Sequence, residues 1–409
     1  MKKAIFVIGL GFGDEGKGSI VNFLAEQIQS SGYGKLVTVK YNGGPNAGHN
    51  VIKNSKHHTF SQFGSNMLSH GFTYISSYSL FEPLAFIKER NALCSTAYLS
   101  NIDSIIINPN TKIITPWQII AQRYRNMKSK FSTTGMGIAE CMSDFNTGLS
   151  VTFEDIIARK CRDKLQDIRD LKYKELGIDL TESVDTVQNL LQRYCRGILC
   201  KDEYLFANNN LFEDSTFIFE GSQGVLLDEC YGFHPYTTWS NCTFDNAFNI
   251  CSKIGIGKNN ITKIGVIRSY STRHGDGPFP TENSLYRFED PHNNDCGYQG
   301  KFRQGALDLN LIKYSLDVLG GVDYIAMNHT DFLHSEMELC TEYKNFELKK
   351  NELKRTDSNF LIKQEEITNQ LFKAEPVITK STSFIEDAEK YLNTPIKIIG
   401  TGPNRKEYI

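Results

Sequence analysis

The stretch that decides the fold is residues 3–29, KAIFVIGLGFGDEGKGSIVNFLAEQIQ. Its first part, Lys3–Leu10, is an unbroken apolar and β-branched run, which is typical of a strand buried on both faces of a sheet. Glycines then recur up to Gly18, and Ser19–Gln29 carries apolar residues at helical spacing. A strand, a glycine-rich turn and a helix in this order predict a phosphate-binding loop at the start of an α/β fold.

The glycine-rich turn fits the spacing GxxxxGK, in which backbone N–H groups hold phosphates and the lysine, here Lys17, reaches across them. The following helix adds the positive end of its dipole. Gly18 stands where such loops usually have the Ser or Thr that holds magnesium. Because Mg²⁺ favours one or two carboxylates together with substrate phosphates, we expect Asp14 to be its ligand. The alternative is a tight turn with surface charges.

Further strands and helices predict the fold class. The expected class is α/β: a mostly parallel central sheet flanked by helices, with a P-loop-like nucleotide site and helical and small β insertions. We expect one large domain over 1–409, with a helical insertion at about 153–200 and a charged, solvated C-terminal subdomain at about 341–392. A helix is predicted at 116–125, and additional strands are predicted at 35–41, 105–107, 216–219, 263–267, 324–327 and 396–399.

Several polar loops follow these strands, where ligands of parallel sheets gather. The loop NGGPNAGH ends at His49, which could be a general acid, although a lone histidine is more often structural. The loop at 132–137 could form a backbone nest for a second phosphate or be a plain loop. Residues 220–241 offer amides suited to a base edge and hydroxyls suited to a phosphate, and 271–282 is predicted to be an ordered functional loop.

Asp331 follows the strand predicted at 324–327 directly. Its carboxylate could accept two hydrogen bonds from guanine, from N1–H and the 2-amino group, which adenine cannot supply. The alternative is a surface turn. A last glycine-rich loop, which contains Gly402, follows the final predicted strand.

Composition excludes several classes of protein. The chain has 409 residues, 45 basic and 47 acidic side chains and 40% hydrophobic residues, which excludes a disordered or fibrous chain and gives no case for nucleic-acid binding. No apolar run approaches the length of a membrane span, and the first run leads into glycines rather than a cleavage site. Ten cysteines without a CxxC are expected to be reduced and mostly buried, with no zinc site. We therefore expect a folded, cytoplasmic protein without a membrane partner, and composition says nothing about its chemistry.

Taken together, these segments resemble those of adenylosuccinate synthetases, ligases of purine biosynthesis. They follow the order of that family from residue 11 to 407. The matching segments are GFGDEGKG (11–18), NGGPNAGH (42–49), STTGMGI (132–138), EGSQGVLLDECYGFHPYTTWSN (220–241), STRHGDGPFPTE (271–282) and GTGPNRKE (400–407).

The resemblance implies a two-step reaction. Asp14 would remove the N1 proton of IMP so that the 6-oxygen attacks the γ-phosphate of GTP, and His49 would donate to the β–γ bridge. The amine of L-aspartate would then displace phosphate from the 6-phosphoryl intermediate. The family works as a homodimer in which an arginine of the partner completes the nucleotide pocket.

The resemblance also assigns residues to each ligand. The catalytic residues would be Asp14, His49 and Lys17. Asp14 and the carbonyl of Gly48 would bind Mg²⁺. The expected triphosphate-binding residues are Gly13, Glu15, Gly16, Lys17, Gly18, Gly48, Asp331 and Gly402; those for IMP are Asn46, Thr133, Thr134, Gln223 and Thr238; those for aspartate are Lys301 and Arg303, with Arg303 as the main clamp.

Departures from the family pattern leave two alternatives open. Met136 and His329 stand where the family usually has arginine and lysine, 145–149 lacks the basic residue expected of a partner, and the aspartate loop is shortened to YQGKFRQG. A phage branch with a similar loop joins aspartate to dGMP and uses ATP; most of it lacks the catalytic aspartate, which Asp14 retains here. The second alternative is an inactive nucleotide-binding regulator.

Overall fold

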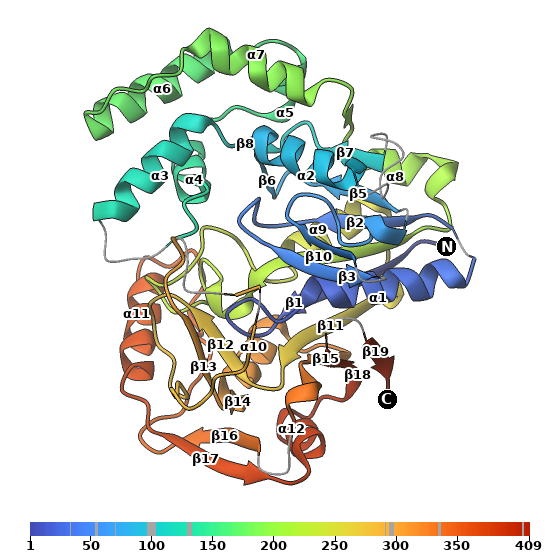
Figure 1. Ribbon diagram of the computed structural model, residues 1–409, viewed down its shortest axis with the longest axis vertical. Helices are drawn as coiled ribbons and strands as arrows, with labels where there is room; N and C mark the ends of the chain where they lie inside the picture. The colour runs from blue at the N-terminus through green and yellow to red at the C-terminus, as the bar shows by residue number, and fades with distance from the viewer. Residues whose placement is uncertain are drawn as a thin grey trace.

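The computed structural model describes residues 1–32, 34–53, 56–69, 71–95, 104–128, 133–290, 292–293, 298–333, 337–402 and 405–409, except for the side chains of 56 and 405. A sheet of ten strands forms its centre (Figure 1). Neighbouring strands are parallel except for the antiparallel pair at one edge, β18 and β19. The order is β19 (Arg405–Tyr408), β18 (Ile396–Thr401), β15 (Tyr324–Asn328), β11 (Ile261–Arg268), β1 (Lys3–Gly9), β10 (Thr216–Gly224), β2 (Leu36–Lys40), β5 (Phe72–Ile75), β7 (Ile105–Ile107) and β9 (Leu199–Cys200).

Strand β1 lies inside this sheet and is covered on both faces, as its apolar run predicts. Phe6 and Ile8 belong to a hydrophobic cluster that includes residues of α9 and α10, whereas Val7 belongs to a second cluster formed with α1. The predicted mostly parallel sheet flanked by helices is confirmed. The helices are α1 (Lys17–Ser30), α2 (Pro83–Ser95), α3 (Pro116–Lys128), α4 (Ile138–Asn146), α5 (Phe153–Ile157), α6 (Arg162–Leu176), α7 (Val184–Cys195), α8 (Tyr204–Asn208), α9 (Asp245–Ile254), α10 (Leu309–Leu319), α11 (Phe360–Leu371) and α12 (Phe384–Leu392).

Among the described residues, no helix has the length and apolar character needed to cross a bilayer.

Short strands form small sheets beside the central one. The small sheets pair β3 (His49–Lys53) with β4 (Lys56–Phe60), β6 (Leu80–Phe81) with β8 (Lys112–Ile113), β12 (Ser271–His274) with β13 (Phe302–Gly305), and β16 (Met337–Tyr343) with both β14 (Leu307–Asp308) and β17 (Pro376–Ser381).

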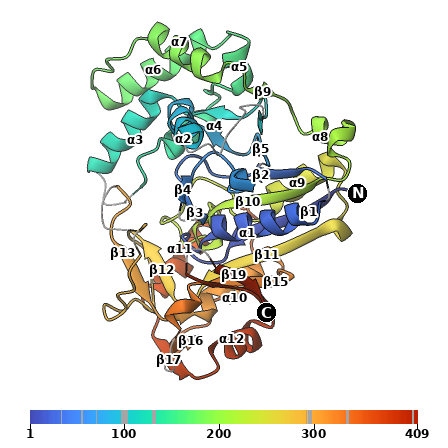
Figure 2. The ribbon, with the colours of Figure 1, turned by 45° about the vertical axis from the view of Figure 1, so that its right-hand side comes forward.

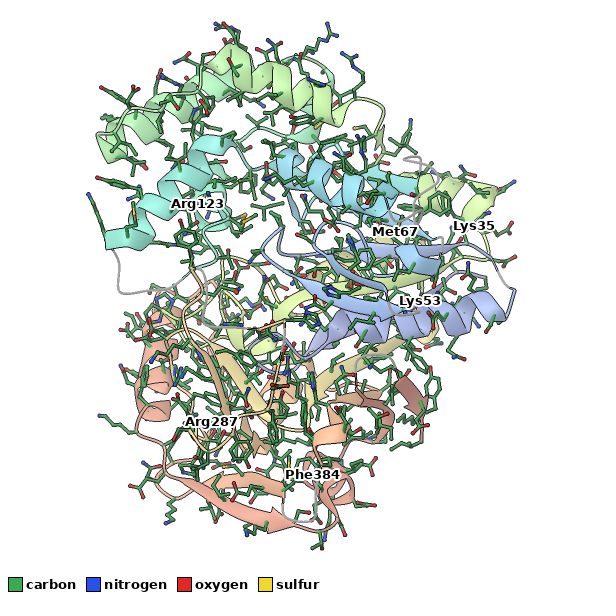
Figure 3. The ribbon with its side chains drawn as sticks, in the orientation of Figure 1. Lys35, Lys53, Met67, Arg123, Arg287 and Phe384 are labelled. Carbon is green, nitrogen blue, oxygen red and sulfur yellow. The ribbon has the colours of Figure 1, made fainter. Side chains whose placement is uncertain are left out.

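Two groups of elements extend from the sheet at opposite ends of the molecule, α5–α7 at the top and β16, β17 and α12 at the bottom of Figures 1 and 2. Residues 153–200 include the helices α5, α6 and α7, and β9 lies at the edge of the sheet. Residues 341–392, predicted to be a charged, solvated subdomain, also contribute to the core. Leu371 of α11 and Phe384 of α12 (labelled in Figure 3) are buried in the same cluster as Phe6, because each helix turns an apolar stripe inward.

Candidate active site

One large cavity, of about 1200 Å³, opens among the loops that follow the parallel strands β1, β2, β10, β11 and β15. Loops gather there because the carboxyl ends of parallel strands meet at one edge of the sheet. Most residues that the sequence singles out line this cavity. They are Gly13, Asp14, Gly16, Lys17, Gly18, Asn46, Gly48, His49, Thr133, Thr134, Gln223, Thr238, Asp331 and Gly402.

The glycine-rich loop after β1 is held from within by Glu15. Its carboxylate accepts hydrogen bonds from the backbone N–H groups of Gly11 at 3.0 Å and Gly13 at 2.8 Å, and it pairs with Lys17 Nζ at 2.6 Å. Glu15 is 3% exposed and does not line the cavity. In this structure Glu15 shapes the loop and holds Lys17, and its predicted contact with the triphosphate stays a prediction.

The structure explains why Gly18 replaces the usual hydroxyl residue. A Cβ at Gly18 would lie 2.6 Å from the Cβ of His49 and 3.0 Å from Ser65 Oγ, closer than side-chain atoms approach one another. Helix α1 begins against the chain that enters β3, so a serine or threonine has no room there. Any magnesium ligand must come from elsewhere in the loop.

Asp14 occupies an unusual backbone position at the mouth of this loop, with φ of 63°. A left-handed conformation is unfavourable for a residue with a side chain, so the surroundings must impose it. The guanidinium of Arg268 donates from Nε to the carbonyl oxygen of Asp14, and His274 Nε2 lies 3.5 Å from Asp14 Oδ2. Burial raises the pKa of the Asp14 carboxyl, and His274 and Arg268 oppose that rise.

His49 lines the same cavity, with one ring nitrogen bonded and the other open. Nδ1 is 2.7 Å from Glu220 Oε1, whereas Nε2 is buried without a hydrogen-bond partner among the described residues. Burial lowers the pKa of His49 although Glu220 acts to raise it, so the ring is neutral near pH 7. Glu220 fixes the proton on Nδ1, and the unpartnered Nε2 is the atom left for a ligand.

Glu220, fully buried near the end of β10, is the main functional residue that sequence reasoning missed. Besides His49 it binds Lys40 Nζ at 3.1 Å and the backbone N–H of Ser65 at 3.2 Å, and the Ser65 hydroxyl donates to its Oε1. Burial alone would raise the pKa of Glu220, but Lys40 and His49 lower it well below its usual value. A carboxylate inside an apolar strand was the available signal, since buried charges need a partner.

The wall predicted for the purine monophosphate carries acceptors without partners. Oε1 of Gln223 and Oδ1 of Asn46 are buried and, within the described residues, accept no hydrogen bond. Thr133 and Thr134 line the same cavity beside them, whereas Ser132 of that loop lies outside the described residues. Unpaired buried amide oxygens are costly, which favours a ligand that donates hydrogen bonds here.

The loop after β15 brings Asp331 and His329 to the far end of the cavity. Asp331 Oδ1 accepts a hydrogen bond from the backbone N–H of Gly402 at 2.8 Å, which links the two predicted loops. Burial lowers the pKa of His329 to about 3, so its ring is neutral where the family usually has a charged lysine. Burial also lowers the pKa of the neighbouring Lys406, to about 8.

The predicted aspartate clamp is not brought to the cavity. Lys301 and Arg303 do not line it, and the Arg303 guanidinium donates to the carbonyls of Gly275 at 3.0 Å and Gly277 at 2.9 Å and pairs with Glu282. Strand pairing of β13 with β12 places Arg303 opposite Arg273 and uses its donors on the loop that follows β12.

Arg273 itself lines the cavity and is 2% exposed. Its guanidinium donates to the carbonyls of Asp276 and Pro278, both at 3.0 Å, and lies over the ring of Phe12. Burial, together with Arg303, lowers its pKa to about 9. Its Nη2 lies 3.5 Å from the carbonyl oxygen of Tyr236, and among the described residues Arg273 forms no ion pair with a carboxylate.

The donor set in the cavity fits magnesium held mainly by substrate. The described residues contain no cluster of three or more His, Cys, Asp or Glu side chains that could hold a metal alone. Asp14 and Gly48 nevertheless line one cavity, and no described residue donates a hydrogen bond to Asp14 Oδ1. One carboxylate and one carbonyl beside bound phosphates are typical of Mg²⁺.

Comparison with known proteins identifies the family of this chain. The adenylosuccinate synthetase family model matches residues 6–409. The adenylosuccinate synthetase of Clostridium botulinum strain Eklund 17B is 30% identical over 435 residues, covering 99% of this chain and 98% of that protein.

Two solved structures share the fold. The fully ligated adenylosuccinate synthetase of Plasmodium falciparum has a TM-score of 0.81 at 24% identity, with 99% of each chain covered. The succinoaminodeoxyadenylate synthetase of cyanophage S-2L, solved with dGMP and with dATP as an energy donor, has a TM-score of 0.60 at 13% identity, covering 99% of this chain and 94% of that one. From the family match over nearly its whole length, this chain belongs to the adenylosuccinate synthetase family of purine-biosynthesis ligases.

Proposed function

We propose that this chain joins L-aspartate to the 6-position of IMP with hydrolysis of GTP, giving adenylosuccinate, GDP and phosphate. The observation that carries the proposal is that Asp14, Lys17 and His49 line one cavity, with Glu220 bonded to His49. A carboxylate, a phosphate-binding lysine and a histidine with a free ring nitrogen are the groups that phosphorylation of a purine oxygen requires.

In the first step, Asp14 takes the N1 proton of IMP, and the electron pair moves to O6, which attacks the γ-phosphorus of GTP. GDP leaves, and the purine carries a 6-phosphoryl group. Asp14 must be ionised to accept that proton, so the opposition of His274 and Arg268 to its raised pKa favours catalysis. Asn46 and Gln223 offer acceptor oxygens on the wall assigned to IMP.

His49 stabilises the negative charge that develops on the leaving β-phosphate. Its neutral ring has no proton on Nε2 in the free chain, because Glu220 holds the proton on Nδ1. A bound triphosphate adds negative charge beside Nε2, and Glu220 already favours the charged ring. We therefore infer that His49 becomes protonated when the nucleotide binds and then donates from Nε2.

In the second step, the amine of L-aspartate attacks C6, the C6–O bond breaks, and phosphate leaves with the former O6. The attacking amine loses its proton, and the product is adenylosuccinate. Since Lys301 and Arg303 lie outside the cavity, we assign the aspartate carboxylates to Arg273, whose charge has no anionic partner among the described side chains.

Asp14 and Gly48 are the residues that would hold magnesium in this cavity. When bound, Mg²⁺ neutralises charge on the transferred phosphoryl group. Asp331 is the proposed reader of guanine, because its Oδ2 remains available beside the Oδ1 that Gly402 occupies. The neutral His329 beside it leaves ATP as the alternative donor. We place the reaction in the cytoplasm and propose that the chain acts as a homodimer.

The proposal is tested by phosphate release from the purified chain with L-aspartate, Mg²⁺ and each of the four pairs of IMP or dGMP with GTP or ATP. We expect turnover with IMP and GTP, and none when aspartate is omitted. Turnover with dGMP but not with IMP would replace the proposal by the alternative of aspartate transfer to dGMP. Absence of turnover with every pair would favour the nucleotide-binding regulator.

A further inference from the structure

His274 lines the cavity, and the proposed reaction uses it only through its effect on the pKa of Asp14. It ends β12, opposite Phe302 of β13, and its ring packs on the Phe302 ring with a centroid distance of 4.9 Å. Its side chain is 13% exposed and lines the cavity. The ring is therefore held by its neighbours with one edge turned toward Asp14.

The ring nitrogen Nε2 faces two oxygen acceptors. It lies 3.5 Å from Asp14 Oδ2 and 3.3 Å from Asn293 Oδ1. The identity of the Asn293 oxygen follows from its other end, since Asn293 Nδ2 donates to Asp290 Oδ2 at 2.9 Å. An atom that faces two acceptors must carry the proton, so Nε2–H bonds to Asn293 Oδ1 and lies at ion-pair distance from the Asp14 carboxylate.

These contacts close a ring of polar groups around Asp14. Arg268 donates from one side to the carbonyl oxygen of Asp14, and its Nη1 pairs with Asp290 Oδ2 at 2.9 Å. Asp290 accepts from Asn293, which in turn fixes His274. Arg268 thus holds the backbone of Asp14, and His274 lies beside one of its carboxylate oxygens, although the φ of 63° is unfavourable for a side-chain-bearing residue.

We propose that His274 is a positioning residue for Asp14: its Nε2–H holds Oδ2, so that Oδ1 is turned to the substrate. The inference rests on the proposed function, in which Asp14 is the base. No described residue donates to Oδ1, as the role requires. A base held in one orientation reacts faster than one free to rotate, because the approach geometry is set before the proton moves.

The test compares His274→Leu, which removes the donor, with His274→Gln, which keeps an N–H donor at a similar reach. We expect His274→Leu to lower kcat at least tenfold while each substrate KM stays within threefold of wild type, and His274→Gln to keep kcat within threefold. The control is His57→Leu: His57 stacks on His292 beside Asn293 but does not line the cavity, and we expect normal kcat.

A wild-type kcat in His274→Leu would overturn the inference, and so would a His274→Gln variant as impaired as His274→Leu. If His274→Leu does not fold, the inference is judged by the kcat of His274→Gln and by the position of the proton on the His274 ring. Nitrogen-15 NMR of the resting protein should find a proton on His274 Nε2, with a resonance that shifts in Asn293→Ala because one of its two acceptors is lost; an Nε2 without a proton would overturn the inference. If the wild-type chain turns over no substrate pair, the proposed function fails by that result and the NMR measurement alone judges His274.

Discussion

Replacing Glu220 by glutamine removes the charge behind His49 while keeping the shape of the side chain. In the native chain the carboxylate accepts from His49, Lys40 and both the N–H and the hydroxyl of Ser65. The glutamine amide has one acceptor oxygen, so it cannot satisfy donors on both sides. Lys40, only 4% exposed, loses its ion-pair partner.

The expected cost follows from these contacts. Breaking a buried ion pair by neutralising one member typically costs about 3–5 kcal/mol, and we expect that loss in the free energy of unfolding. The pKa of Glu220 is lower in the folded chain than its reference value of 4.5. Its contribution to stability is therefore present above about pH 4.5 and decreases as the pH falls toward the lowered pKa. The difference between wild type and variant should shrink in acid.

The same substitution should slow turnover, because the Glu220 carboxylate stabilises the protonated form of His49. Losing acid catalysis typically costs about 10²–10⁴ in kcat. Urea unfolding followed from pH 7 to pH 4 gives the stability, and phosphate release gives kcat. Glu213→Gln is the matched control, since Glu213 is exposed and should change neither. A Glu220→Gln variant with native stability and native kcat would refute the reasoning.

Three further predictions concern the same cavity. Asp14→Asn should lower kcat by about 10²–10⁴ in the phosphate assay, and a near-normal rate would remove Asp14 as the base. Calorimetry of GTP binding at pH 7.5 in two buffers of different ionisation enthalpy should detect proton uptake. Burial lowers the pKa of His49, so its ring is neutral in the free chain and gains the proton when GTP binds. The same uptake in His49→Gln would show that another group takes up the proton. Arg303→Leu should cost about 2 kcal/mol of stability, since its bonds to loop carbonyls are lost, and leave the KM for aspartate within threefold. Arg273→Met should instead raise that KM at least tenfold, and the reverse pattern would restore Arg303 as the clamp.

Local sequence patterns were enough to predict the first strand, turn and helix of the fold. In residues 3–29 the strand, the glycine-rich turn and the helix each follow from short-range patterns, and the structure has β1 and α1 there. The reason for Gly18 was not predictable, because it depends on His49 packing against it from a different loop.

Contacts between residues that lie far apart in the sequence, on strands that are neighbours in the sheet, could not be predicted from the sequence. Strand β10 lies between β1 and β2, which puts Glu220 level with Lys40 and within reach of His49, 171 residues away. The pairing of β12 with β13 likewise directs Arg303 to backbone carbonyls, which the sequence alone does not indicate. The loops could be predicted to converge, whereas the partner of each charge could not.

The most direct test of the central claim follows the oxygen atom of the purine. IMP labelled with oxygen-18 at position 6 is incubated with the chain, GTP, L-aspartate and Mg²⁺, and the released phosphate is analysed by mass spectrometry. The account predicts that each phosphate released with adenylosuccinate carries the labelled oxygen, because O6 bonds to the γ-phosphorus before aspartate displaces it. Adenylosuccinate formed together with unlabelled phosphate would contradict it.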